Sequence, residues 1–486
     1  MTAIATNKFR IRNAQNFVSS ISTIPLYAFI GRPQTWLVDS PVGSNVNESL
    51  PRTPEDNRET ESYTMQGIMQ MKKINSSSVI HACKNRKWTS GYNYNPYLSN
   101  YDGTVGAKSL TSETLFYPES VAEANYYVVS NGFVYVCLEE GTGTSTVDPN
   151  LTCGTGYVPA KGADGYLWKM VAQASNTELS AFETPEFFPV SNDTTNKTYQ
   201  AAAMTHVVPG AVYSIRVPSG GTGSSWGTTS ITGAVANNFI NVIGDGTGLE
   251  FDLNISSGKI VSVTVTNPGS GYTHAKFALG SAGTGKTLGT LGAVISSKSG
   301  LGADVIADLN AYFVIITNLL TGAEGGDFNG FTVNNDYRVI GLVSRPLQWN
   351  SSTQCASSHV DGTTILVLDS NVNINPDDTV TIGSGRKAYV VDNGVVGAGD
   401  IAGDVFVGQK YLRVIFTQIE NTGFGQANDP IAVNDPITNG TANTTIDHIV
   451  NPGYEPQSGD LLYYENRRPI SRAEDQNEYI RVVIEF

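Results

Sequence analysis

The sequence predicts a mainly β protein with a few helices, in the α+β class, made of antiparallel β-sandwich-like domains with a glycine-rich β insertion. Three observations support this prediction. Runs rich in Val, Ile and Thr are punctuated by many of the 50 glycines, a texture typical of strands joined by turns. Charged residues make up only 15% of the chain, against about 25% in typical soluble proteins. Residues 479–486 alternate strictly between two faces, as in a half-buried strand.

The length of 486 residues is typical of a chain with two or three domains. Residues 1–91 contain signals for about two strands and two helices, too few for an independent sheet. Residues 346–486 are rich in strand signals. We therefore expect these two segments to share one discontinuous domain, with residues 92–345 inserted as a β-rich domain. Within the insert, residues 191–300 form the glycine-rich part. A linear arrangement of three domains is the alternative.

The N-terminal part predicts two helices and two strands. An apolar stripe of Ala14, Phe17, Val18 and Ile21 predicts a helix over residues 13–20. Leu26–Ile30 follows Pro25 and reads as a strand. Thr53, Pro54 and two acidic residues form a helix-start signal, and we expect that helix to continue to about Met71. Val79–Cys83 is the second strand.

In the middle of the chain, the strongest local signal is a hairpin over residues 125–139. Asn131-Gly132 separates two apolar runs, and Asn-Gly favours a two-residue turn. Residues 164–171 predict a further strand. Residues 260–279 alternate up to a turn expected at Pro268-Gly269. Several strands are expected over residues 361–420, and residues 421–451 are expected to be a loop.

The C-terminal stretch, residues 459–486, predicts two strands around a charged connection. Leu461–Tyr464 and residues 479–486 are the strands. Between them lies an unusual concentration of Arg, Asp and Glu, which favours bidentate pairs that hold a tight turn. A solvated turn between two edge strands is the alternative. The apolar Phe486 predicts an end tied into a sheet or an interface.

Both ends of the chain resemble one family of virion proteins. The string YENRRPISRAEDQNEYIRVVIEF and the N-terminal string FRIRNAQNFVSSISTIPLYAFIGRPQTW resemble the dimeric baseplate wedge subunit of contractile-tailed, T-even-like bacteriophages. Internal strings such as WTSGYNYNPYLSNYD, DGYLWK and TPEFFPV resemble the same family, and the glycine-rich insertion interrupts the likeness. The resemblance covers roughly three quarters of the chain.

This resemblance implies a late, non-enzymatic structural protein of the viral tail. Such a subunit would act as a homodimer, contact other wedge proteins of the same phage, and help to transmit the rearrangement of the baseplate during contraction. It would assemble in the host cytoplasm and reside in the virion, with no nucleic acid or membrane as partner. The structural or interface candidates lie in the two terminal motifs: Arg12, Asn13, Trp36, Glu465, Asn466, Arg467, Pro469, Arg472, Gln476, Glu478, Arg481 and Phe486.

Composition argues against several other classes. The formal charge of −14 disfavours wrapping a phosphate backbone, and no apolar run reaches the length of a transmembrane helix. The four cysteines lack Cys-x-x-Cys spacing and the five histidines are scattered, so no metal site is expected. A glycan-binding or glycan-degrading tail protein is the alternative function, suggested by the Gly-, Thr- and Asn-rich texture.

One motif resembles a nucleotide site. GSAGTGKT, with Gly280, Gly285, Lys286 and Thr287, matches the spacing of a P-loop. A P-loop requires a helix directly after the motif, but the next residues are rich in glycine and do not favour one. We interpret the match as accidental and expect no cofactor and no catalytic residue.

Overall fold

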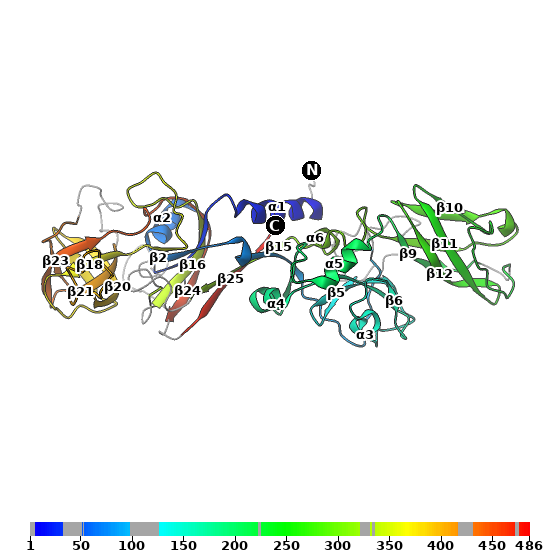
Figure 1. Ribbon diagram of the computed structural model, residues 1–486, viewed down its shortest axis with the longest axis horizontal. Coiled ribbons are helices and arrows are strands. Elements are labelled where there is room, and N and C mark those ends of the chain that lie inside the picture. The colour runs from blue at the N-terminus through cyan, green and yellow to red at the C-terminus, as the bar shows by residue number, and fades with distance from the viewer. Residues whose placement is uncertain are drawn as a thin grey trace. The chain divides into compact units, whose positions relative to one another are not determined.

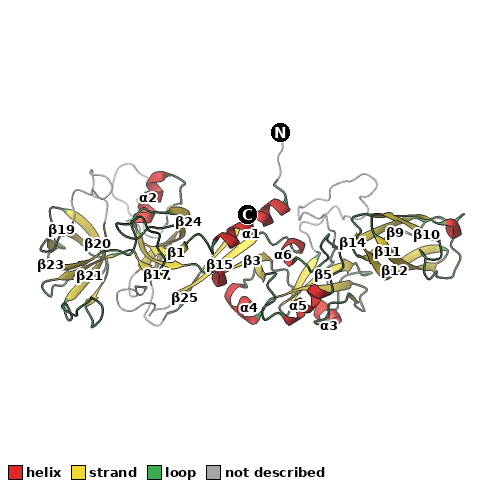
Figure 2. Ribbon diagram, turned by 45° about the horizontal axis from the view of Figure 1, so that its top comes forward, coloured by secondary structure: helices red, strands yellow, loops and turns green. Residues whose placement is uncertain are grey.

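The computed structural model describes residues 5–32, 51, 53–97, 126–221, 225–320, 331–332, 336–416, 431–471 and 476–486. Strands account for 43% of the residues and helices for 13%, and strands dominate the view in Figure 2. The strands form many antiparallel sheets and one small closed barrel. The predicted β-rich α+β class is therefore confirmed.

The chain divides into two compact units, each made of separated segments. One unit contains residues 1–18, 80–315 and 483–486, and the other contains residues 19–79 and 316–482. The boundaries thus differ from residues 91 and 345, where the distribution of helix and strand signals placed them.

A five-stranded antiparallel sheet forms the first part of the second unit (Figure 1). Its order is β17 (His359–Asp361), β2 (Ile68–Lys73), β1 (Leu26–Gly31), β16 (Asp336–Ser344) and β24 (Asp460–Ser471). Tyr27, Phe29 and Val343 are among the side chains of its core. All six residues of β1 are buried.

The helix predicted over residues 53–71 is shorter than expected. Helix α2 spans Arg58–Gln66, and its first turn is capped by Asn57, whose side-chain oxygen accepts a hydrogen bond from the Thr60 amide at 2.9 Å. Gly67 ends it, because glycine is a poor helix former. The next residues join the sheet as β2, so the continuation to Met71 was wrong.

The second unit also contains a closed six-stranded barrel. Its order is β18 (Thr364–Leu368), β21 (Lys410–Phe416), β20 (Arg386–Val395), β19 (Thr379–Ile382), β22 (Pro436–Thr438) and β23 (Asn443–Val450). Leu366, Val390 and Ile446 fill its interior with 0% exposure. The strands of residues 361–420 were expected, but closure and the last two strands, in the segment expected to be a loop, were not.

The first unit is built around the predicted hairpin. β4 (Tyr127–Ser130) and β5 (Phe133–Glu139) pair antiparallel. Asn131 and Gly132 have φ angles of 50° and 79°, the left-handed values that this turn requires, so the hairpin is confirmed. β7 (Leu167–Gln173) and β6 (Ala160–Lys161) complete the sheet.

Several helices and a further four-stranded sheet also belong to the fold. The helices are α1 (Asn7–Ser20), α3 (Pro149–Cys153), α4 (Asn176–Phe182), α5 (Thr198–Thr205) and α6 (Val305–Asp308). The sheet has the order β25 (Glu478–Glu485), β15 (Phe313–Leu320), β3 (Val79–Lys84) and β8 (Phe187–Val190). The first helix thus begins six residues before the position predicted from its apolar stripe.

The glycine-rich segment folds as three two-stranded sheets around its own core. These strands are β9 (Val212–Ser219), β10 (Ile240–Gly244), β11 (Thr247–Ser256), β12 (Lys259–Ser270), β13 (Ala275–Leu279) and β14 (Thr290–Ile295). Trp226, Phe251 and Leu253 lie in that core. Pro268 pairs with Leu249 inside β12, so the turn expected there is wrong; the chain reverses instead at Ser257-Gly258, where both φ angles are positive.

Candidate assembly surface

The C-terminal candidates lie mainly on β24, which is one edge of the five-stranded sheet. This strand is 12 residues long and continues through the charged run to Ser471. Glu465 stands opposite Ile340, and Ser471 opposite Asp336. The expectation that residues 465–471 form a tight turn is therefore wrong. The backbone of this run pairs with β16, which is distant in the sequence, so the charge pattern of the run alone does not predict a strand.

Pro469 lies where β24 bulges. The register passes from Tyr337 opposite Ile470 to Val339 opposite Asn466, so three residues of β24 stand across from Arg338 alone. Proline lacks an amide hydrogen and is tolerated in a strand at such a bulge. The bulge also twists the edge locally and limits the length over which another strand can pair with it.

The N-terminal part of β24 carries apolar side chains on both sides. Leu461 and Tyr464 pack against the sheet core, whereas Leu462 and Tyr463 are 52% and 36% exposed. The Tyr464 hydroxyl accepts from the Glu55 amide at 2.7 Å and donates to the Glu55 carbonyl at 2.8 Å. One face of β24 is therefore anchored to the rest of the unit, and the other presents apolar surface.

The charged side chains of this edge make pairs on the surface. Arg467 Nη2 contacts Glu465 Oε2 at 3.1 Å on the same strand, and Arg345 Nη2 contacts Asp460 Oδ2 at 2.5 Å. All four side chains are more than a third exposed, so each pair contributes roughly 0–1 kcal/mol. The Arg467–Glu465 pair does not close a turn, contrary to the expectation for this run.

The remaining candidates are distributed over three places. Glu478 begins β25 and accepts a hydrogen bond from the Tyr337 hydroxyl at 3.4 Å. Arg481 lies further along β25, and Gln476 lies two residues before the start of that strand. Arg12 is exposed and Asn13 partly buried on α1. Trp36 and Arg472 lie outside the described residues.

Phe486 is packed rather than frayed. Its ring lies 5.4 Å from that of Phe17, centroid to centroid, and its amide donates to the Tyr312 carbonyl at 3.4 Å. The two terminal motifs therefore meet within the first unit. The structure brings Phe486 to α1, the helix that carries Arg12 and Asn13.

An ionic cluster, in which Arg32 is buried and Asp377 largely exposed, links the sheet that contains β24 to the barrel. The Arg32 guanidinium contacts the carboxylates of Asp336 and Asp377 and lies 4.1 Å from the centroid of the Tyr389 ring. Arg338 joins Asp336 from the other side at 3.1 Å. Burial opposes ionisation of Asp377, but hydrogen bonds from Tyr389 and Arg32 outweigh it and lower the pKa. Nothing in the local sequence around Arg32 indicated this role.

A second buried pair lies at the same junction. Arg413 on β21 contacts Asp361 on β17 at 3.0 Å between Nη2 and Oδ2, and Arg413 stands opposite Asp392 on β20. Burial raises the pKa of Asp361, against the opposing effect of Arg413. Burial likewise raises the pKa of Asp392 to about 6. An arginine within the apolar run KYLRVIF was the available signal, because a buried cation needs a carboxylate partner.

The first unit has two buried charged side chains, Lys169 and Asp308, that the sequence did not indicate. Lys169 is 1% exposed, donates to the Leu301 carbonyl at 3.1 Å, and has its pKa lowered to about 8 by burial. Burial raises the pKa of Asp308 to about 6, and Asp308 Oδ2 accepts from the Gly302 amide at 2.7 Å. Both side chains thus fix the backbone of the 301–302 loop.

The P-loop-like motif has a different geometry from a nucleotide site. After β13, residues 281–283 form one 3-10 turn, and β14 starts at Thr290, so this described stretch has no helix whose N-terminus could face a phosphate. The Lys286 ammonium lies 5.2 Å from the Trp226 ring centroid and donates to the Ser225 carbonyl at 3.3 Å. Lys286 and Thr287 hold Trp226 in the core of the glycine-rich segment, since the Thr287 carbonyl accepts from the Trp226 indole at 2.7 Å.

Metal sites and membrane-spanning helices are two further features to consider in the described part of the chain. They contain no cluster of three or more His, Cys, Asp or Glu side chains placed to hold a metal ion. No helix among them has the length and apolar character needed to cross a membrane. Comparison with known proteins found no matching family model and no similar curated protein.

Proposed function

We propose that this chain is a structural subunit of the baseplate wedge in a contractile phage tail. In this proposal it acts without catalysis or cofactor, as a homodimer that joins neighbouring wedge proteins and helps to transmit the rearrangement of the baseplate. Its place would be the tail baseplate of the virion, after assembly in the host cytoplasm.

The observation that carries the proposal is the contact between the two terminal motifs. These are the segments whose sequences resemble the wedge family most specifically, and they pack through Phe17 and Phe486. The fold thus brings together two segments that lie at opposite ends of the sequence and resemble the same family, and neither is a frayed tail.

The edge strand β24 supports an assembly role for the C-terminal motif. An edge strand with exposed apolar side chains favours pairing or packing with another chain. Leu462 and Tyr463, in the N-terminal half of the strand, supply such side chains. Register shifts at Leu462 and around Pro469 limit extended pairing of this edge with another strand, so packing of these side chains is the favoured contact. We assign this N-terminal half, residues 460–466, as the assembly edge.

Native mass spectrometry of the purified chain, alone and mixed with the other wedge proteins of the same phage, tests the proposal. We expect a dimer that enters a larger complex at whole-number stoichiometry. Replacing both Leu462→Asp and Tyr463→Asp should weaken one of these associations at least tenfold, because charge is costly to bury in an interface. Val405, which is 74% exposed in the barrel region, provides the control Val405→Asp.

A chain that stays monomeric and indifferent to the wedge proteins would contradict the proposal as a whole. A dimer that forms equally well with the double substitution would contradict only the assignment of the assembly edge. Thermal unfolding of each variant separates a loss of association from a loss of folding.

A further inference from the structure

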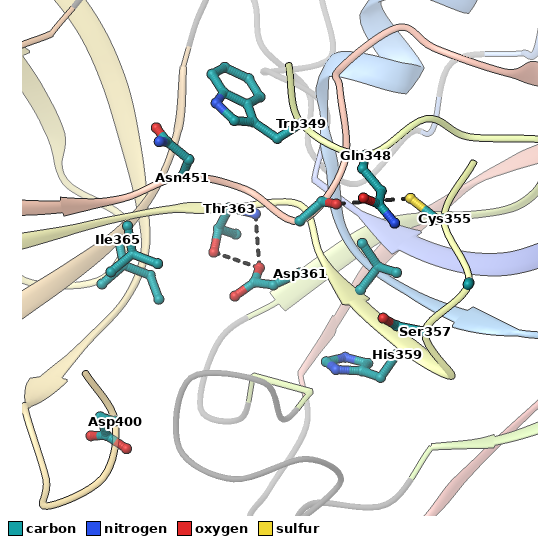
Figure 3. Close-up of a pocket in the computed structure, with 14 residues that line it drawn as sticks. Gln348, Trp349, Cys355, Ser357, His359, Asp361, Thr363, Ile365, Asp400 and Asn451 are labelled. Carbon is teal, nitrogen blue, oxygen red and sulfur yellow. Dashed lines mark hydrogen bonds between the residues drawn. The ribbon is translucent and has the colours of Figure 1, made fainter. Parts of the chain in front are cut away.

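A cavity of about 580 Å³ lies in the second unit, beside the connection between β17 and β18 (Figure 3). Its volume falls within the range of roughly 300–1,000 Å³ typical of small-molecule sites. All the residues that line it belong to this unit.

An aromatic side chain, Trp349, lines the cavity. Trp349 is 40% exposed and lies in a short loop closed by a bridge between Leu347 and Gln354. The Asn350 amide donates to Glu455 Oε2 at 3.0 Å, and the Glu455 amide donates to the Leu347 carbonyl at 2.8 Å. These contacts fix the backbone of the loop that carries the indole, and restricting the loop reduces the entropy cost of binding.

Polar side chains of mixed type also line the cavity. Gln348 and Asn451 contribute amides, Ser357 a hydroxyl, Asp400 a carboxylate and His359 an imidazole. Gln348, Ser357 and Asn451 are exposed. Together these groups offer both donors and acceptors. Figure 3 shows Trp349 and Asn451 on one side of the cavity and Ser357 and His359 on the other.

The floor of the cavity is fixed and its charge is compensated. Asp361 Oδ1 accepts from the Thr363 amide at 2.8 Å and from the Thr363 hydroxyl at 2.7 Å, as drawn in Figure 3. Its other oxygen contacts Arg413. Among the described residues that line the cavity, none is Lys or Arg, so its wall favours an uncharged ligand over an anion.

We propose that this cavity binds a neutral saccharide of one or two sugar rings. One face of a pyranose ring carries C–H groups that can stack on the Trp349 indole, while its hydroxyls match amide, hydroxyl and carboxylate side chains at the rim. An exposed Trp on a braced loop, in a cavity lined by mixed donors and acceptors, fits a polyol better than an apolar ligand, which would leave these polar groups without partners. This site is independent of the assembly edge.

Saturation-transfer difference NMR tests the proposal on the intact chain. The probes are glucose, galactose, N-acetylglucosamine, rhamnose, lactose and maltose, with glucuronic acid as the charged comparison, each at about 10 mM. We expect at least one neutral sugar to bind in the millimolar range or tighter, with glucuronic acid binding more weakly than its neutral counterpart glucose.

Variants locate the binding. Trp349→Ala should lower the affinity at least tenfold, whereas Trp349→Tyr should retain it within a few-fold because an aromatic face remains. Asn451→Ala should lower it about threefold to tenfold, as expected for the loss of one hydrogen bond. Tyr479, which is 58% exposed on β25, provides the control Tyr479→Ala, which should leave sugar binding unchanged.

The proposal is overturned if none of the neutral sugars gives a signal, or if Trp349→Ala leaves that signal intact. Melting temperatures close to that of the unmodified chain would show that the variants fold. Because Trp349→Ala leaves residues 460–466 unaltered, native mass spectrometry of the same variant should show unchanged association. The NMR signal therefore tests sugar binding and native mass spectrometry tests assembly, so either proposal can fail without the other.

Discussion

Arg10 and Glu485 form an ion pair across 475 positions of the sequence, with 3.1 Å between Nη1 and Oε1. Their side chains are 36% and 56% exposed, so solvent screens the attraction and the pair adds little stability. The neighbouring contact between Phe17 and Phe486 buries apolar surface and has more to contribute. Packing of the two rings therefore contributes more than the ion pair to holding the two terminal motifs together.

Phe486→Ala is expected to lower the free energy of unfolding by about 1–3 kcal/mol, because it removes a large part-buried ring. Phe17→Ala should have a similar effect. The double variant should fall short of additivity by about 0.5–1.5 kcal/mol, the usual coupling of an aromatic pair. Urea denaturation of the four proteins measures this cycle.

Phe9→Ala is the matched control, since Phe9 lies on the same helix but is 57% exposed. It should change stability by less than about 0.5 kcal/mol. Full additivity of Phe17→Ala and Phe486→Ala would contradict the claim that these rings hold the termini together.

Local signals were sufficient where the structure is itself local. The Asn131-Gly132 turn requires left-handed φ angles that Asn and Gly tolerate, and the two flanking runs pair with each other across it. The strand at Leu26–Gly31 was likewise evident from its apolar run and the Pro25 before it. In both places propensity, pattern and tertiary context agree.

Long-range pairing explains what the sequence did not reveal. Residues 465–471 look like a charged turn, yet β16 supplies their partners from more than 100 positions away. Closure of the barrel depends on β18 pairing with both β21 and β23, which no local pattern encodes. The cavity beside Trp349 was also missed, because its walls come from separate segments that only the fold assembles.

Asp392→Asn is expected to change how stability depends on pH. Burial raises the folded-state pKa of Asp392 to about 6, above the unfolded value near 3.9. Between about pH 4 and pH 6 the folded chain therefore binds more protons than the unfolded chain, and this group's contribution to stability falls as the pH rises. The variant lacks this titration.

Melting temperatures of both proteins at intervals from pH 4 to pH 7 measure the effect. The variant should gain stability relative to the unmodified chain as the pH rises through that window, and the difference should level off above it. Asp369→Asn, at an exposed carboxylate, is the control. If the difference in melting temperature between Asp392→Asn and the unmodified chain stays constant with pH, the prediction is contradicted.

Arg413→Met is expected to destabilise the barrel strongly at neutral pH. It leaves the carboxylate of Asp361 buried without the cation that contacts it, a change that typically costs about 3–5 kcal/mol. The loss should be smaller at about pH 5, where carboxyls with raised pKa values take up protons. Urea denaturation at the two pH values measures it, and Arg467→Met, at an exposed pair, should cost less than about 1 kcal/mol. Equal losses at the two sites would contradict a buried role for Arg413.

Gly341→Ala is expected to disturb the sheet directly beneath the assembly edge. A Cβ atom at this position in β16 would lie 2.4 Å from the Phe29 ring and 2.4 Å from the Tyr463 carbonyl oxygen, and a β-carbon cannot approach a backbone atom so closely. Either Phe29 leaves its core position or β24 shifts, at a cost of about 1–3 kcal/mol. Gly143→Ala, where the added carbon meets no atom within 4 Å, should be neutral. Because Tyr463 lies in the assembly edge, Gly341→Ala should also weaken the association measured by native mass spectrometry. If the variant is less stable but associates as well as the unmodified chain, residues 460–466 do not form the interface.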